Sequence, residues 1–245
     1  MIADKLLGRL PDKRASLVIS SGEYPELTES LRQIGVCPIT TISDRRLPEP
    51  IQWHPDMQAC AIGDRLIVLR KGGLKNVLAE HGIHISETMK LPESVYPGDV
   101  ICNALAWGRF ILGNSKTADK VVRQAAEGMK AVWIDVKQGY AACAAALVDE
   151  RSAITSDEGI ALRLEQHGIE VLRISPGYIR LPGYPYGFIG GCCGKLAPNM
   201  MAFAGRLDRH RDGKRIREFL ADRDVYAVEL LDGELLDVGG LIALC

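Results

Sequence analysis

The sequence lacks long hydrophobic runs and any excess of charge. No stretch of 18 or more apolar residues occurs, and the opening residues MIADKLLGRLPDKR contain no apolar signal-peptide region. The 30 basic and 31 acidic residues give a formal charge of -1, with neither sign clustered. These absences argue against a membrane protein and against electrostatic binding to nucleic acids. We therefore expect a cytoplasmic protein whose partner is a small molecule.

The seven cysteines include no CxxC pair, and an odd number does not suit a disulfide framework. In a cytoplasmic protein they are expected to be free thiols. Cys60, Cys102 and Cys143 lie in apolar segments, where a free cysteine usually serves as a small core residue. The GFIGG stretch lacks the strand-to-helix context of a phosphate loop. The sequence therefore predicts no metal and no cofactor.

One pattern recurs along the chain: an extended segment, a turn, an apolar strand, an amphipathic helix and a closing strand. It is clearest from His54 to Leu69, where Gly63-Asp64 is the turn of a predicted hairpin. The helix that follows ends at His81-Gly82, because glycine tolerates the left-handed cap. Three later copies start near residues 96, 137 and 184, with predicted turns at Trp107-Gly108, Asp149-Glu150 and Pro198-Asn199.

Each end of the chain carries part of such a unit. SLVIS (16–20) is a second hairpin strand without an opening strand, and LLDVGGLIALC (235–245) is an opening strand without a partner. Helix-terminal glycines recur at intervals of 47, 46 and 40 residues, a period typical of repeat architectures. The predicted fold is a closed five-bladed ββαβ propeller of the α/β class, with pseudo-fivefold symmetry and residues 1–245 in a single domain. The alternative is an ordinary α/β domain.

Hairpin geometry predicts which polar residues lie together. The starts of opening strands and the ends of return strands share one end of an antiparallel hairpin. Polar residues converging there on a central axis would form a site for a small polar ligand. The candidate ligand-binding residues are Asp56, Asp99, Lys137, Tyr140 and Asp237 from the starts, and Arg70, Asn114 and Asp157 from the ends.

Asp56, Asp99 and Asp237 occupy matching places in HPDM, PGDV and LLDV. Three carboxylates around one axis repel one another, which raises at least one pKa unless a cation lies among them. A guanidinium suits this position because it is planar, permanently charged and able to bond carboxylates bidentately. The alternative is that each aspartate bonds local amides at a strand or turn.

His54 is the candidate general base, since histidine titrates near neutral pH. The other four histidines lie at predicted helix ends or in predicted surface segments. The alternative is that His54 is a structural residue of a His-Pro turn.

A ring of five ββαβ units resembles the pentein fold, also called the guanidine-modifying-enzyme fold. The finer resemblance is to a bacterial branch of it, through the motifs HPDM (54–57), VKQGY (136–140), TSD (155–157), LPGYPYGFIGGCCG (181–194) and DVGG (237–240). Enzymes of this fold use a cysteine nucleophile after a glycine-rich turn near the C-terminus, a mid-chain histidine, and carboxylates that hold a guanidinium.

The resemblance makes Cys245 and His54 the candidate catalytic residues of a guanidino-group hydrolase or amidinotransferase. Two departures bear on this. Cys245 lies about one place late after Gly239-Gly240, and VKQGYAACAAALV contains no histidine. The other expectation is therefore a non-catalytic pentein that binds a small ligand or a macromolecule.

Overall fold

The computed structural model describes residues 9–244, and most of its strands belong to five three-stranded sheets. In each sheet the middle strand pairs antiparallel with the opening strand and parallel with the third. A helix connects the middle strand to the third strand, so each unit has the order ββαβ. Two of these units are β3 (Ala59–Ile62), β4 (Arg65–Val68), α3 (Leu74–Glu80), β5 (Ile85–Glu87), and β6 (Leu105–Trp107), β7 (Phe110–Gly113), α4 (Lys120–Gly128), β8 (Val132–Asp135).

Two further units follow in chain order. They are β9 (Ala145–Asp149), β10 (Ser152–Thr155), α6 (Glu158–Gln166), β11 (Glu170–Arg173), and β13 (Cys193–Ala197), β14 (Met200–Phe203), α7 (Gly213–Ala221), β15 (Tyr226–Glu229). The predicted hairpin turns at residues 63–64 and 198–199 are present, whereas the other two lie one residue later than predicted, at 108–109 and 150–151.

The fifth unit is assembled from segments far apart in the sequence. Strand β17 (Ile242–Leu244) pairs antiparallel with β1 (Leu17–Ser20), with Leu17 opposite Leu244. Helix α1 (Pro25–Gln33) then leads to β2 (Cys37–Thr40), which is parallel to β1. The predicted pairing of the SLVIS segment with the C-terminal strand is therefore confirmed.

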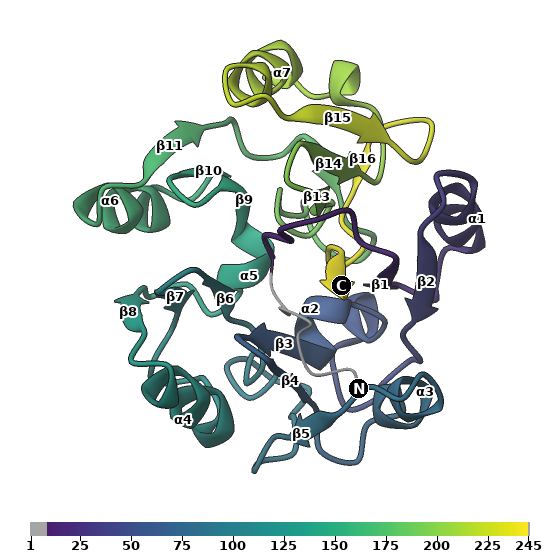
Figure 1. The fold of residues 1–245 in the computed structure, drawn as a ribbon, viewed down its shortest axis with the longest axis vertical. Coiled ribbons are helices and arrows are strands. Elements are labelled where there is room, and N and C mark those ends of the chain that lie inside the picture. Colours follow the sequence, from purple (N-terminus) through teal and green to yellow (C-terminus); the bar gives the residue numbers. More distant parts are fainter. Residues whose placement is uncertain (1–8, 245) are drawn as a thin grey trace.

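The five three-stranded sheets lie around a common centre, and helices α1, α3, α4, α6 and α7 lie on the outside (Figure 1). A sixth, two-stranded sheet pairs β12 (Ile179–Arg180) with β16 (Leu235–Leu236). It connects two long loops near the centre, and those loops contribute residues to the site described below. Short 3-10 helices span Glu49–Ile51 and Leu207–Arg209.

Local sequence explains the outer helices. Asp119 and Asp157 cap α4 and α6, because their side chains accept hydrogen bonds from Val121 N and Ile160 N. Gly168 ends α6 with a φ of 77°, a conformation that glycine adopts without strain. The buried faces of α4 and α6 are apolar, so packing adds to the stability supplied by the caps. Helix α4 packs against β3 and β4 of the neighbouring unit, and α6 packs mainly against β11 of its own unit.

The predicted opening strands begin too early, and this corrects the sequence prediction. Residues 55–58 and 141–144 form single-turn helices, α2 (Pro55–Gln58) and α5 (Ala141–Ala144), immediately before β3 and β9. Proline suits the first turn of a helix and alanine favours the helical state. Residues 99–104 and 187–192 are also outside strands. The candidate polar residues therefore lie on turns and loops ahead of the strands.

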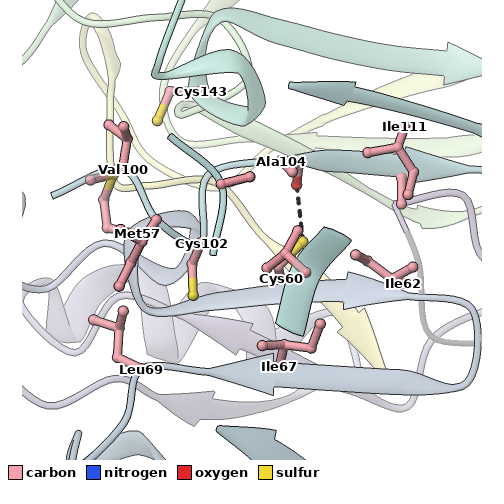
Figure 2. Close-up of a cluster of buried hydrophobic side chains, with 14 of the residues drawn as sticks. Met57, Cys60, Ile62, Ile67, Leu69, Val100, Cys102, Ala104, Ile111 and Cys143 are labelled. Atoms are coloured by element: carbon pink, nitrogen blue, oxygen red, sulfur yellow. Dashed lines mark hydrogen bonds between the residues drawn. The ribbon is translucent and has the colours of Figure 1, made fainter. Parts of the chain in front are cut away.

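Apolar clusters fill the space between neighbouring units. Figure 2 shows one of them, in which Cys60 of β3 donates a hydrogen bond to the backbone oxygen of Ala104, at 3.4 Å. Cys60 and Cys102 are fully buried there, as predicted for small core residues. None of the helices in residues 9–244 has the length and apolar character needed to cross a bilayer.

Candidate functional site

A pocket with a volume of about 450 Å³ opens where the segments ahead of several opening strands meet. Its floor is formed by His54, Cys143 and Asp237. His54 directly precedes α2, Cys143 lies in α5, and Asp237 directly follows β16. Three separate parts of the chain thus bring an imidazole, a thiol and a carboxylate to one hollow.

Backbone groups hold Asp237 in place. Its Oδ2 accepts a hydrogen bond from Phe188 N at 2.8 Å, and its Oδ1 accepts one from Gly239 N at 3.1 Å. The chain at Gly191 runs so close that a Cβ atom there would lie 2.0 Å from Asp237 Oδ1. Glycine is therefore required at this position, which accounts for part of the glycine-rich FIGGCCG segment.

Burial controls the protonation of the floor. Asp237 is 1% exposed, and burial together with the charge of Asp56 raises its pKa to about 7. Burial lowers the pKa of His54 to about 3, although its Nδ1 lies 3.7 Å from Asp237 Oδ1. The imidazole is consequently neutral at physiological pH, whereas Asp237 is close to half ionised.

Asp56 is fully buried in α2, next to His54. Neither of its carboxylate oxygens has a hydrogen-bond partner among residues 9–244. Burial raises the pKa of Asp56 to about 6, and the positive charge of Arg9 opposes that rise. Asp56 is therefore a buried carboxylate that has Arg9 as a compensating charge but no direct hydrogen-bond partner among the described residues, which is uncommon inside a protein.

Asn103 connects the two single-turn helices beneath the pocket. Its Nδ2 donates to Cys143 Sγ at 3.1 Å and to Asp56 O at 3.2 Å, while its Oδ1 accepts from Ala142 N at 2.7 Å. Burial, followed by the charges of Asp56 and Asp237, raises the pKa of the Cys143 thiol well above its usual range. The thiol is thus held in its protonated form.

Asp99 lies beside the pocket and is fully buried. Its Oδ2 accepts a hydrogen bond from the Tyr140 hydroxyl at 2.5 Å, and its Oδ1 has no partner within the part of the chain that the structure describes. Burial and this carboxylate raise the pKa of Tyr140. The pair fixes the orientation of the Tyr140 ring, which lines the pocket.

Aromatic rings form the walls. Tyr140 lies between Tyr96 and Phe188, with ring centroids 5.7 Å and 6.4 Å away, and Tyr186 packs edge-on against Phe188 at 6.3 Å. Tyr184 also lines the pocket. Aliphatic side chains and one amide complete the lining: Ile51, Met57, Leu181, Pro185 and Gln138.

Of the predicted site residues, His54, Tyr140 and Asp237 line this pocket, and Asp56 and Asp99 are buried next to lining residues. Lys137 and Asp157 instead line an adjacent depression of about 780 Å³, whose wall also includes Tyr96 and Gln138.

Two further predicted residues, Asn114 and Arg70, lie elsewhere. Asn114 donates a hydrogen bond from Nδ2 to Lys137 O, and Arg70 is exposed and donates to Met89 O. Cys245 lies outside the described residues. His210, placed on the surface by the sequence, is buried against Tyr178.

Sequence reasoning missed Cys143 and most of the aromatic wall. The sequence pattern predicts an apolar strand at Cys143, but this residue lies in α5, one helical turn after Tyr140. Tyr184 and Phe188 come from a loop rich in proline and glycine, which carries no hydrophobic period. One signal was available: aromatic residues in a Gly/Pro-rich loop cannot be needed for a sheet face, so their role has to be sought at a surface or a site.

Solved structures with the same fold were identified by comparison. An inosamine-phosphate amidinotransferase from Streptomyces griseus is 11% identical, with a TM-score of 0.59 over 98% of this chain and 96% of that one. An agmatine deiminase from C. jejuni is 10% identical, with a TM-score of 0.55 over 92% and 89%. A DDAH from Pseudomonas aeruginosa, complexed with citrulline, is 10% identical, with a TM-score of 0.52 over 89% and 93%.

These likenesses show that the chain has the mixed α/β pentein fold. Residues 18–242 match the model of a family of unknown function, DUF6873, and the chain belongs to that family. No curated protein matches the sequence. At about a tenth of residues identical, the structural likeness establishes the fold, and the activity has to be argued from the pocket.

Proposed function

We propose that this protein binds a small organic cation with a guanidinium or amidinium group over Asp237 in the aromatic pocket. The observation that carries the proposal is the pair of buried carboxylates, Asp56 and Asp237, at a hollow of suitable size. Neither carboxylate oxygen of Asp56 has a hydrogen-bond partner among residues 9–244. Such a pair of buried carboxylates destabilises the empty protein through desolvation and mutual repulsion. A bound cation offsets both terms, and a planar one can also bond the carboxylate bidentately.

Binding without chemistry is the function that the floor supports best. Nucleophilic catalysis by cysteine requires a thiolate in an electropositive setting. The Cys143 thiol instead faces two carboxylates that raise its pKa, and His54 is too weak a base at neutral pH to remove its proton. The protonated thiol is then one more neutral group of the pocket floor.

A titration by NMR with methylguanidine tests the binding proposal, and methylurea is the neutral analogue of almost the same shape. We expect methylguanidine to bind at least tenfold more tightly than methylurea at pH 8. Asp237→Asn should abolish that preference, whereas Glu165→Gln, an exposed control on α6, should keep it. Equal affinities for the two compounds in the unaltered protein would refute a cation site.

Affinity for methylguanidine should also depend on pH. Because the pKa of Asp237 is raised to about 7, protons compete with the cation below that pH. Affinity should therefore fall by roughly tenfold between pH 8 and pH 6. A pH-independent affinity would show that the cation is held by another group.

A guanidino-group hydrolase or amidinotransferase is the second candidate, because a thiol, a histidine and carboxylates share one pocket. Labelling with a chloroacetamidine-type probe distinguishes the two. The binding proposal predicts no cysteine that reacts much faster than the rest. Selective labelling that is lost in Cys143→Ser, or in Cys245→Ser, would instead identify an enzyme and its nucleophile.

For the architecture, we propose a closed five-bladed propeller with pseudo-fivefold symmetry that unfolds as one domain. The pairing of β1 with β17 supports this proposal. Thermal unfolding should then give one cooperative transition, and deletion of residues 236–245 should unfold the chain by leaving β1 with an open edge. Two separate transitions, or a folded truncated protein, would count against closure.

A further inference from the structure

The walls of the pocket contain more aromatic surface than a bare guanidinium needs. Tyr140 and Phe188 lie deep, whereas Tyr96, Tyr184 and Tyr186 stand at the rim and remain 49%, 39% and 41% exposed. Exposed rings gathered around a hollow mark a surface that gains stability when an apolar group covers it.

The same walls provide no cationic partner for a negatively charged group on the ligand. Among the described residues that line the pocket there is no lysine or arginine, and Gln138 is the one amide. A ligand carrying a carboxylate would have to lose its hydration against aromatic and aliphatic groups, which is unfavourable without a partner.

Arg9 acts on Asp56 but does not line the pocket. Other cationic side chains line the adjacent depression, beyond Tyr96 and Gln138. Arg163 is already engaged there, donating to Asp135 O at 3.1 Å and to Gln166 Oε1 at 2.8 Å. Lys137 is exposed to solvent, where an ion pair adds little. The two hollows therefore differ in chemistry, although Tyr96 and Gln138 contribute to both.

We infer that the ligand of this pocket is a cation with a flat apolar body, an aryl or arylalkyl amidine or guanidine, and not an α-amino acid such as arginine. This inference rests on the proposed function and adds the chemical class of the ligand. The cationic head lies over Asp237, and the body stacks against Tyr140, Phe188 and the rim tyrosines. Rings flanking the head contribute cation–π attraction as well as apolar contact.

The pocket volume is consistent with such a ligand. About 450 Å³ lies within the range of small-molecule sites and leaves room for an aromatic ring beyond the charged head. Methylguanidine would occupy the floor alone and leave the rim tyrosines hydrated.

Isothermal titration and NMR at pH 8 with benzamidine, benzamide, methylguanidine and arginine test the inference on the full chain. Benzamidine should bind at least tenfold more tightly than methylguanidine and arginine, and far more tightly than the neutral benzamide. Tyr186→Ala should weaken benzamidine binding at least fivefold while leaving methylguanidine unchanged. Tyr226→Ala is the matched control, because Tyr226 is 48% exposed on β15 and does not line the pocket.

The outcomes separate this inference from the proposed function. If arginine binds as tightly as benzamidine, the inference of an apolar ligand body is wrong, but the cation site remains supported. If Lys137→Ala then abolishes arginine binding, the arginine carboxylate lies in the adjacent depression. Benzamide binding as tightly as benzamidine would overturn the cation site and the inference with it. A failure of all four compounds to bind would have the same consequence.

Discussion

The carboxylates of Asp56 and Asp237 at the pocket floor are buried, whereas those of Glu158 and Glu165 on α6 face solvent. Both glutamates pair with Arg173 in solvent, and the arginine lowers the pKa of Glu165. Both floor aspartates are buried, and their pKa values are raised to about 6 and about 7. The outer carboxylates are thus easily ionised, whereas ionising the floor carboxylates costs free energy of folding.

The two regions consequently respond to pH in opposite directions. A carboxyl whose pKa is raised above its unfolded value of 3.8 binds more protons in the folded state, so its contribution to stability increases as the pH falls from about 7 to 4. Glu165 contributes stability above its unfolded pKa of 4.5, and loses that contribution as the pH falls through its lower folded value. When ionised, the floor carboxylates lower the stability of the folded protein, whereas Glu165 adds to it. Such a loss of stability is the trade-off expected at residues that bind a ligand.

The largest effect should come from crowding the floor. In Gly191→Ala the new methyl group would lie 2.0 Å from Asp237 Oδ1, so backbone or carboxylate must move. We expect a loss of more than about 3 kcal/mol in urea unfolding, or no folded protein. Gly128→Ala, where a methyl group meets nothing within 4 Å, is the control and should be neutral or slightly stabilising. A fully stable Gly191→Ala protein would show that the floor is loosely packed.

Removing one floor charge should raise stability. Asp56→Asn keeps the side-chain shape and removes a buried charge whose pKa is raised to about 6. The gain should be about 3 kcal/mol at pH 8 and about half of that at pH 5, where Asp56 is protonated in the folded protein but still ionised in the unfolded chain. It should vanish only below the unfolded pKa of 3.8. Urea unfolding at the two pH values measures it. A loss of stability at pH 8 would mean that Asp56 is an ordinary structural residue.

Removing the hydrogen bond between Tyr140 and Asp99, beside the pocket, should lower stability more modestly. Tyr140→Phe deletes the hydroxyl that bonds Asp99 at 2.5 Å and leaves that carboxylate buried without a partner. We expect a loss of about 1–2 kcal/mol, against a change of under about 0.5 kcal/mol for the exposed control Tyr226→Phe. If both substitutions had equal effects, the Tyr140–Asp99 pair would not be a stabilising contact.

The smallest effect on stability is expected for the exposed ion pairs of α6. Arg173→Ala removes ion pairs to Glu158 and Glu165 that are largely in solvent. The melting temperature should fall slightly at low salt, and the difference should vanish at high ionic strength, because screening weakens exposed pairs. A large decrease in melting temperature that does not depend on salt would contradict the contrast between the exposed carboxylates of α6 and the buried ones at the pocket floor.

The ββαβ repeat and the pairing of β1 with β17 could be predicted because each rests on patterns within a short window: period, turn residues and helix-ending glycines. The placement of His54, Tyr140 and Asp237 near one another follows from the same hairpin geometry. The helical turns α2 and α5 could not be predicted, since distant groups hold them: Asp56 N donates to Gly239 O, and Ala142 N donates to Asn103 Oδ1.

The aromatic wall escaped prediction for a related reason. Apart from Tyr140, which the sequence predicts at the site, its residues come from loops 96–98 and 181–188, whose conformations depend on contacts with other units. The sequence predicts a raised pKa among the aspartates through repulsion, and the charge of Asp56 does raise the pKa of Asp237. Burial is the largest cause for both residues, and it could not be predicted from the sequence. Grouping three aspartates predicted repulsion, but the structure buries Asp99 against a tyrosine hydroxyl instead.

The pairing of β1 with β17 has a consequence for the synthesis of the protein. Strand β1 is made more than about 200 residues before its antiparallel partner at residues 242–244. At about 5–20 residues per second, β1 waits about ten seconds or more with one edge open and its apolar side chains uncovered. Folding of this unit is therefore completed after translation of β17, and until then β1 has an open edge that is a template for pairing with other chains.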